Sequence, residues 1–97
     1  FVLGPAHELL PAGAYAALQL TVNKNGQPET TGAGVNALGG PDIALTWLAN
    51  YLNTQSRMLK SKDVITTGVV TGLVYVAAGD EIASSCAELG TVSALYK

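Results

Sequence analysis

Charged residues are scarce in this sequence. Lys, Arg, Asp and Glu make up 12% of the 97 residues, and the formal net charge is −2. The five Lys and Arg residues form no basic stripe, so nucleic acid is not expected as a partner. Because 48% of the residues are hydrophobic, the composition excludes a disordered chain and indicates a folded domain.

The sequence also has only one cysteine and no long apolar run. The single thiol, Cys86, has no partner for an internal disulfide, which points to the reducing cytoplasm; we interpret it as a small apolar filler of a strand. No apolar run approaches the ~20 residues that a membrane-spanning helix needs, so no membrane association is predicted. The N-terminal segment lacks the pattern of a signal peptide.

The size of the chain limits it to one domain, predicted over residues 1–97. A core built from so few residues is marginal, so partners would help to stabilise it. The first residue is Phe1 rather than methionine, and FVLG begins in mid-pattern. We therefore expect that the chain was cut from a longer one or that its N-terminus was processed.

A hairpin is the clearest local signal. Leu18, Leu20 and Val22 alternate with polar residues, which predicts a half-buried strand. The dipeptide Asn25-Gly26 is typical of a two-residue hairpin turn, because both residues tolerate positive φ. The return strand is predicted over 29–34.

One helix is predicted, over 41–55. Pro41 suits the first helical position, while Asp42 in the first turn and Arg57 near the end complement the helix dipole. Residues at helical spacing form an apolar stripe, which consists of Ile43, Trp47, Leu48, Tyr51 and Leu52. We expect Trp47 to lie in the core or at an interface.

The remaining elements are predicted to be mostly β. The Pro-rich start reads as a loop, with room for one helical turn. Strands are expected over 64–67, 69–76, 81–87 and 91–96, with a turn at the AAGD sequence of 77–80. The predicted fold class is therefore mostly β with one main helix, an α+β arrangement.

Six motifs in order carry a resemblance to a known family. They are TGAG (31–34), LGGP (38–41), ALTWLAN (44–50), LKSKDVITTG (59–68), AAGD (77–80) and ELGTVS (88–93). Together they resemble the C-terminal part of the 2-keto-4-pentenoate hydratase and 4-oxalocrotonate decarboxylase group, in the fumarylacetoacetate hydrolase superfamily. That group serves meta-cleavage pathways of aromatic degradation, and it prefers Lys-Ala-Gly-Asp where residues 60–63 read Lys-Ser-Lys-Asp.

The resemblance implies a mixed β roll or sandwich, an oligomeric assembly and a metal-dependent reaction. Three carboxylates of the family hold Mg²⁺ or Mn²⁺, which chelates a small 2-oxo acid, and a lysine or carboxylate assists proton transfer. These family residues precede the segment that matches FVLG. No catalytic residue, metal ligand or cofactor is therefore expected in this chain alone, which would be a partial catalytic domain.

The threonines of TTGVVTG, residues 66–72, are the candidate substrate contacts. By resemblance, Thr67, Gly68 and Thr71 match family residues that border the substrate pocket, whereas Val69 replaces a serine. A glycine lets backbone N–H groups approach a carboxylate, and a threonine hydroxyl can donate to the same oxygens. An ordinary strand end explains the same residues, and Thr66 is expected on the opposite face with a structural role.

Two functions follow. In the first, the chain is the C-terminal portion of a hydratase acting on a 2-hydroxypenta-2,4-dienoate-like substrate, or of a decarboxylase acting on a 4-oxalocrotonate-like one. It would supply part of the pocket, be inactive alone and need a companion N-terminal segment. The alternative is a non-catalytic small β domain acting in binding or homo-oligomeric assembly through its strand edges. An independent hydrolase using Cys86 and His7 is disfavoured, because no orienting acid is indicated.

Overall fold

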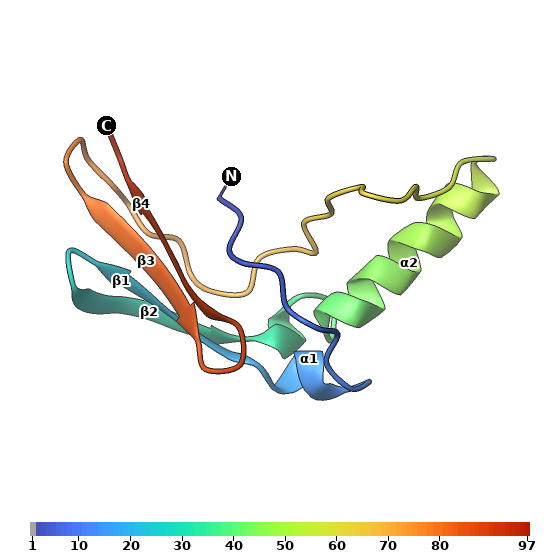
Figure 1. The fold of residues 1–97 in the computed structure, drawn as a ribbon, viewed down its shortest axis with the longest axis horizontal. Coiled ribbons are helices and arrows are strands. Elements are labelled where there is room, and N and C mark those ends of the chain that lie inside the picture. The colour runs from blue at the N-terminus through green and yellow to red at the C-terminus, as the bar shows by residue number, and fades with distance from the viewer. Residues whose placement is uncertain (1) are drawn as a thin grey trace.

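The computed structural model describes residues 2–97 as a small sheet and one long helix at opposite ends of the molecule (Figure 1). A short helix and a 3₁₀ turn join the two ends. The elements in chain order are α1 (Ala14–Ala17), β1 (Gln19–Lys24), β2 (Gln27–Ala33), η1 (Gly34–Asn36), α2 (Pro41–Thr54), β3 (Glu81–Cys86) and β4 (Gly90–Leu95). No helix among the described residues is long and apolar enough to cross a bilayer.

The sheet is antiparallel throughout, with strand order β2-β1-β3-β4. The predicted hairpin is confirmed, since β1 and β2 are joined by Asn25 and Gly26 with φ values of 52° and 79°. Both values are positive, as the tightest hairpin turns require. The predicted strands at the C-terminus are also confirmed as β3 and β4, and one turn of helix, α1, follows the Pro-rich start. The α+β class is confirmed.

The predicted helix is confirmed as α2, but its apolar stripe is not part of a core. No residue of α2 is buried, and the side chain of Trp47 is 57% exposed. The Trp47 ring stacks on the ring of Tyr51 with centroids 5.3 Å apart. Of the two positions expected for Trp47, the core is therefore wrong and the interface stays a prediction, because helical spacing shows which residues share a face and not whether anything covers that face.

The predicted strands 64–67 and 69–76 are absent. Residues 63–76, here called the strap, run extended without joining the sheet, except for one isolated bridge between Gly32 and Thr71 (Figure 1). The apolar composition of the strap is that of a strand, but a regular ladder also needs a neighbouring strand with free backbone groups. The sequence pattern carries no information about that neighbour.

Side chains, rather than a ladder, bind the backbone of the strap. The amide of Asn36 donates to the carbonyl of Val70 at 2.8 Å, and the Lys24 ammonium donates to the carbonyl of Tyr75 at 2.8 Å. Gly68 has a φ of 124°, which interrupts regular extension at a conformation that other residues rarely adopt. These features explain an extended segment without strand pairing.

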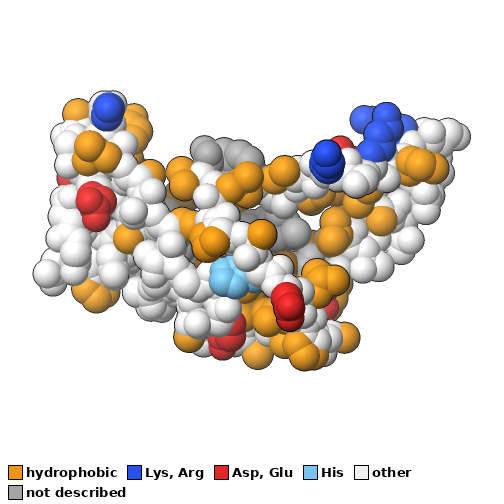
Figure 2. Space-filling view, in the orientation of Figure 1, with side chains coloured by type: hydrophobic (Ala, Val, Ile, Leu, Met, Phe, Trp, Pro, Cys, Tyr) orange, Lys and Arg blue, Asp and Glu red, His pale blue; other side chains and the backbone are white. Residues whose placement is uncertain are grey.

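Little of the molecule is buried. The buried hydrophobic residues are Leu18, Ala37 and Cys86, so the interpretation of Cys86 as an apolar filler of a strand is confirmed. The accessible surface is 7042 Å², whereas a compact monomer of this mass exposes about 5,200 Å². Hydrophobic side chains accordingly show at many places on the surface (Figure 2). The described residues form an open arrangement with much apolar surface left in solvent.

One polar cluster ties the hairpin turn to the start of β3. The carboxylate of Asp80 accepts hydrogen bonds from the Ala77 N–H and from the Asn25 amide, both at 2.8 Å, and its Oδ2 lies 3.4 Å from the Lys24 ammonium. Asn25 in turn accepts a bond from the Glu81 N–H at 2.9 Å and donates its own N–H to the Glu81 carbonyl at 2.8 Å. The Ala77 N–H, followed by Asn25 and Lys24, holds the pKa of Asp80 below its ordinary value.

We expect Asp80→Asn to lower the stability of the chain at neutral pH and to flatten its acid dependence. Because the folded-state pKa of Asp80 is lowered, its ionised form contributes stability above the unfolded-state pKa of about 3.9. That contribution disappears as the pH falls through the lower folded-state value. Thermal unfolding followed by circular dichroism between about pH 2 and 7 measures both effects.

The matched control is Glu29→Gln, on the exposed part of β2. It removes one carboxylate without touching the Asn25 cluster. Equal losses of stability for both variants at neutral pH would contradict the role given to Asp80.

Candidate substrate-binding site

Thr67 lies between two adjoining hollows beside the N-terminal half of α2. The smaller has a volume of about 260 Å³ and is lined by Leu38, Ala44, Trp47, Leu48, Ile65, Thr66, Thr67 and Gly68. The larger has a volume of about 420 Å³ and is lined by Leu9, Tyr15, Pro41, Asp42, Leu45, Thr46 and Thr67. Thr67 is the residue that the two share, and we call them the Thr67 hollows.

The strap brings two of the three candidate residues together. Thr67 and Gly68 both line the smaller hollow, opposite the side chains of α2. Thr71 lies away from them, where it bridges to Gly32 and its hydroxyl donates to the Gly72 carbonyl at 3.3 Å. The structure therefore groups Thr67 with Gly68 and leaves Thr71 at the sheet.

The expected alternation of Thr66 and Thr67 does not occur. Both residues line the smaller hollow, because the strap at this point is not a strand and does not direct successive side chains to opposite faces. Thr66 is exposed, whereas Thr67 is half-buried and also lines the larger hollow. A structural role for Thr66 stays a prediction.

Two residues of the larger hollow were not singled out from the sequence. Asp42 was interpreted only as a partner of the helix dipole, yet its Oδ1 is buried without a hydrogen-bond partner among the described residues. The hydroxyl oxygen of Tyr15 accepts a bond from the Leu10 N–H at 2.9 Å, which leaves its own proton available to donate. The sequence gives no signal for the buried carboxylate oxygen of Asp42 or for the free hydroxyl proton of Tyr15, because each depends on which residues the fold places around the side chain.

The Thr67 hollows combine apolar walls with a few hydrogen-bonding groups. Hydroxyls of Thr67 and Tyr15 and the carboxylate of Asp42 are set among leucines, a composition that suits a small ligand with polar ends. Among the described residues, no Lys, Arg or His lines either hollow. These residues can orient a ligand and exclude water, but they include no basic side chain to compensate a negative charge.

A divalent metal does not fit the described part of the chain. Among residues 2–97, no three side chains of His, Cys, Asp or Glu gather closely enough to hold an ion. Oxygen-rich sites for Mg²⁺ or Ca²⁺ need several such ligands.

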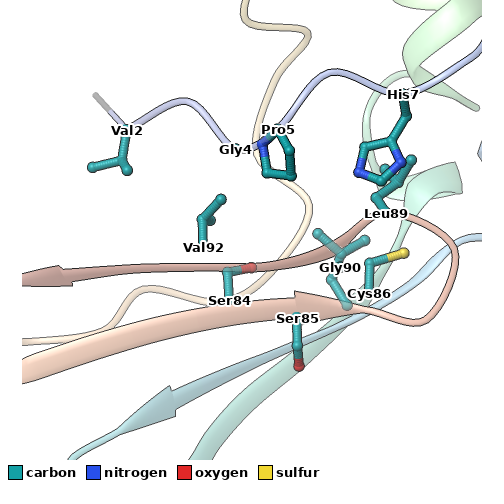
Figure 3. A pocket seen from close by; sticks show the side chains of 11 residues that line it. Val2, Gly4, Pro5, His7, Ser84, Ser85, Cys86, Leu89, Gly90 and Val92 are labelled. Carbon is teal, nitrogen blue, oxygen red and sulfur yellow. The ribbon is translucent and has the colours of Figure 1, made fainter.

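Another hollow, of about 380 Å³, lies between the N-terminal segment and the strands β3 and β4 (Figure 3). His7 and Cys86 both line it, although they are 79 positions apart in the sequence. Apolar residues such as Val92 and Leu89 make up most of its wall. The thiol of Cys86 donates to the Glu88 carboxylate at 3.1 Å, and no hydrogen bond joins it to His7 in the part of the chain described. A nucleophilic thiol needs a base to take its proton, and Glu88 is positioned as an acceptor without a third orienting group.

A family comparison identifies the class of this chain. The fumarylacetoacetate (FAA) hydrolase C-terminal family matches residues 1–95, which is almost the whole sequence. The chain therefore belongs to this family, as its motifs indicate.

Named relatives narrow the comparison further. The 2-hydroxyhexa-2,4-dienoate hydratase of Comamonas testosteroni is 37% identical over 93 residues, which are 96% of this chain and 35% of that protein. The 4-oxalocrotonate decarboxylase of Pseudomonas putida is 37% identical over 79 residues, which are 81% of this chain and 30% of that protein. The chain thus spans about a third of the length of these relatives.

The solved structures agree with the fold. A 4-oxalocrotonate decarboxylase from Pseudomonas putida G7, complexed with calcium and acetate, superposes with a TM-score of 0.79 at 35% identity. The match covers 86% of this chain and 32% of that one. The same decarboxylase in complex with magnesium and adipate matches equally well. Divalent cations are therefore bound by a relative of this chain.

We expect Gly32→Ala to detach the strap from the sheet. A Cβ added at Gly32 would clash with the carbonyl oxygen of Val70, and a backbone atom cannot rotate away as a side chain can. The variant should lose about 1–3 kcal/mol of stability and become cleavable by a protease within the strap. Chemical denaturation and limited proteolysis followed by mass spectrometry provide the two measurements.

Thr31→Ala is the control, because Thr31 is an exposed neighbour on the same strand and changes no close contact. If the strap of Gly32→Ala resisted the protease as well as that of Thr31→Ala, the close approach would not be what holds it.

Proposed function

We propose that this chain is the C-terminal portion of a metal-dependent 2-oxo acid hydratase or decarboxylase and supplies one wall of the substrate pocket. Residues 1–97 would be a single domain that is part of a larger catalytic one. The observation that carries the proposal is the position of Thr67 between two hollows of ligand-binding composition, in a member of the FAA hydrolase C-terminal family. The proposed location is the cytoplasm.

In this proposal Thr67 and Gly68 bind the polar end of a small 2-oxo acid. The hydroxyl of Thr67 donates to a carboxylate oxygen, and the absence of a side chain at Gly68 leaves room for the same group near the backbone. Leu38 and Leu48 of the smaller hollow contact the apolar part and exclude water. Thr71 is retained as a weaker candidate, because it is bridged to the sheet and lines neither of the Thr67 hollows.

The metal and the base would come from outside this chain. A divalent cation, Mg²⁺ or Mn²⁺, would polarise the 2-oxo group and compensate the negative charge that the Thr67 hollows leave uncompensated. Relatives of the chain are about three times its length, which leaves ample sequence for carboxylate ligands and a lysine. We assign no residue of this chain to the metal.

Hydration and decarboxylation are kept as two forms of one proposal. The hydratase of Comamonas testosteroni and the decarboxylase of Pseudomonas putida are both 37% identical over the matched residues. The substrate would be of the 2-hydroxypenta-2,4-dienoate type in the first case and of the 4-oxalocrotonate type in the second. Both are small acids with a conjugated carbon chain, which the apolar walls suit equally.

The 97-residue chain alone is expected to show no turnover of 2-hydroxypenta-2,4-dienoate, with or without Mg²⁺. The reason is that its described residues bring together no metal ligands and place no Lys, Arg or His in the Thr67 hollows. Ultraviolet absorbance of the conjugated substrate follows the reaction directly. Metal-dependent turnover by the purified chain would overturn the assignment of the metal site to another segment.

A chimera tests the pocket itself. The matching C-terminal third of the Comamonas testosteroni hydratase is replaced by this chain, and Thr67→Val is compared with Thr31→Val in the chimera. Loss of one hydrogen bond to a charged ligand costs about 1.5–3 kcal/mol, so Thr67→Val should raise KM by roughly tenfold or more. Thr31→Val, which removes an exposed hydroxyl from β2 and lines neither hollow, should change KM by less than about twofold.

Thermal unfolding of each chimera excludes a general loss of folding. Equal KM values for the two valine variants would remove Thr67 from the substrate site. If the parent chimera folds and stays inactive on both substrate types, the family's activity does not extend to this chain.

A further inference from the structure

The two outer strands of the sheet differ in how their free edges are protected. The edge of β2 carries Pro28 and Glu29, and the strap covers it at the bridge between Gly32 and Thr71. The N–H of Gly72 also donates to the Thr30 hydroxyl at 3.3 Å. Proline, charge and a covering segment are the usual means by which an edge strand is kept from pairing with another molecule.

The edge of β4 has none of these means. Its six residues, Gly90–Leu95, include no proline and no charged residue, and no described strand pairs with its outer side. The N-terminal segment packs on the face of the sheet that carries Val92 and not along this edge. The N–H of Tyr96 donates to the Asp80 carbonyl, which sets the alternation of the ladder. The backbone groups of Ala94, Val92 and Gly90, at every second position before Tyr96, therefore point toward β3. Those of Thr91, Ser93 and Leu95 point away from β3, toward the free edge.

Those outward groups have no hydrogen-bond partner within residues 2–97. A row of three N–H donors and three carbonyl acceptors on an uncharged strand can accept a further antiparallel strand.

We propose that β4 pairs with β4 of a second copy of this chain, antiparallel and about a two-fold axis at Ser93. The two sheets would join into one continuous sheet with β4 strands at its centre. This inference does not depend on the proposed function, because it concerns the free edge and not the Thr67 hollows.

The register follows from the outward residues. With the axis at Ser93, the two copies of Ser93 oppose each other and Thr91 of each copy opposes Leu95 of the other, so that each opposed pair exchanges two hydrogen bonds. No like charges meet along the seam. At each end, Lys97 of one copy falls beside the β3–β4 turn of the other, where Glu88 lies, so the ends are complementary in charge.

The molecule as a whole exposes more surface than a compact monomer does, and Leu95 and Tyr96 contribute to it at the end of β4. The accessible surface exceeds that of a compact monomer of this mass by about 1,800 Å², since 7042 Å² compares with about 5,200 Å². A standard interface removes about 800 Å² from each partner. Pairing at β4, with Leu95 of each copy beside Thr91 of the other, would bury part of this excess, since the side chain of Leu95 is now more than half exposed.

Sedimentation equilibrium of the 97-residue chain, from about 5 to 500 μM, measures the association. A reversible dimer is expected in this range. Ser93→Lys and Ser93→Glu each place two like charges opposite each other at the axis, and each should weaken the dimer at least tenfold. An equimolar mixture of the two variants should recover the wild-type dissociation constant to within about threefold, because the charges are then opposite.

Two further variants separate pairing from folding. Thr31→Lys places the same charge on the same face of the sheet but at β2, and should leave the dimer unchanged. Ser93→Pro removes an outward N–H without removing a bond to β3, and should abolish the dimer while the circular dichroism spectrum is retained.

The proposal is overturned by a wild-type chain that stays monomeric up to 500 μM, as expected if β4 pairs with another segment of a longer polypeptide. It is equally overturned if Ser93→Lys does not weaken the dimer, or if Thr31→Lys weakens the dimer as much as Ser93→Lys does.

Discussion

Strand β1 pairs antiparallel with β2 on one side and with β3 on the other, and these two ladders hold the N-terminal and C-terminal parts of the chain together. Its two sides differ greatly in chain separation: Lys24 and Gln27 meet across a two-residue turn, whereas Leu20 meets Cys86 across the whole middle of the sequence. The second pairing closes a loop that contains α2 and the strap. Closing such a loop costs conformational entropy before the long-range contacts can compensate it, so the hairpin is the natural starting point for folding.

Hydrogen bonds, rather than apolar packing, hold the middle of the chain in place. The strap is bound by the Asn36 amide, the Lys24 ammonium and the close approach of Val70 to Gly32, while the Asp80 cluster fixes its exit into β3. Net hydrogen bonds contribute about 1 kcal/mol each and are weaker where water competes for the same groups. The position of Thr67 is therefore set by a few directional bonds, and pocket geometry is sensitive to single substitutions in them.

The sequence predicts the local elements, but it does not predict which distant segments pack against them. The hairpin and α2 are specified by residues next to one another, such as Asn25-Gly26 and the proline at the helix start. The strap was wrongly predicted as two strands, because its backbone partners are side chains more than thirty positions away. For the same reason Asp42 and Tyr15 were missed: the enclosure around them is built by segments distant in sequence. Family motifs located Thr67 and Gly68, but the separation of Thr71 from them follows only from the path of the strap.

The exposed stack of Trp47 on Tyr51 has a spectroscopic consequence. Trp47 is the chain's single tryptophan, so its emission reports one position on α2 without any label. A solvated indole emits at longer wavelength than one in an apolar contact, and a neighbouring tyrosine at stacking distance can transfer its excitation to it. The chain therefore carries a built-in optical probe for whatever covers α2, whether another segment of a larger enzyme or a separate molecule. Titration of the chain with a companion segment would be visible as a blue shift from this one side chain.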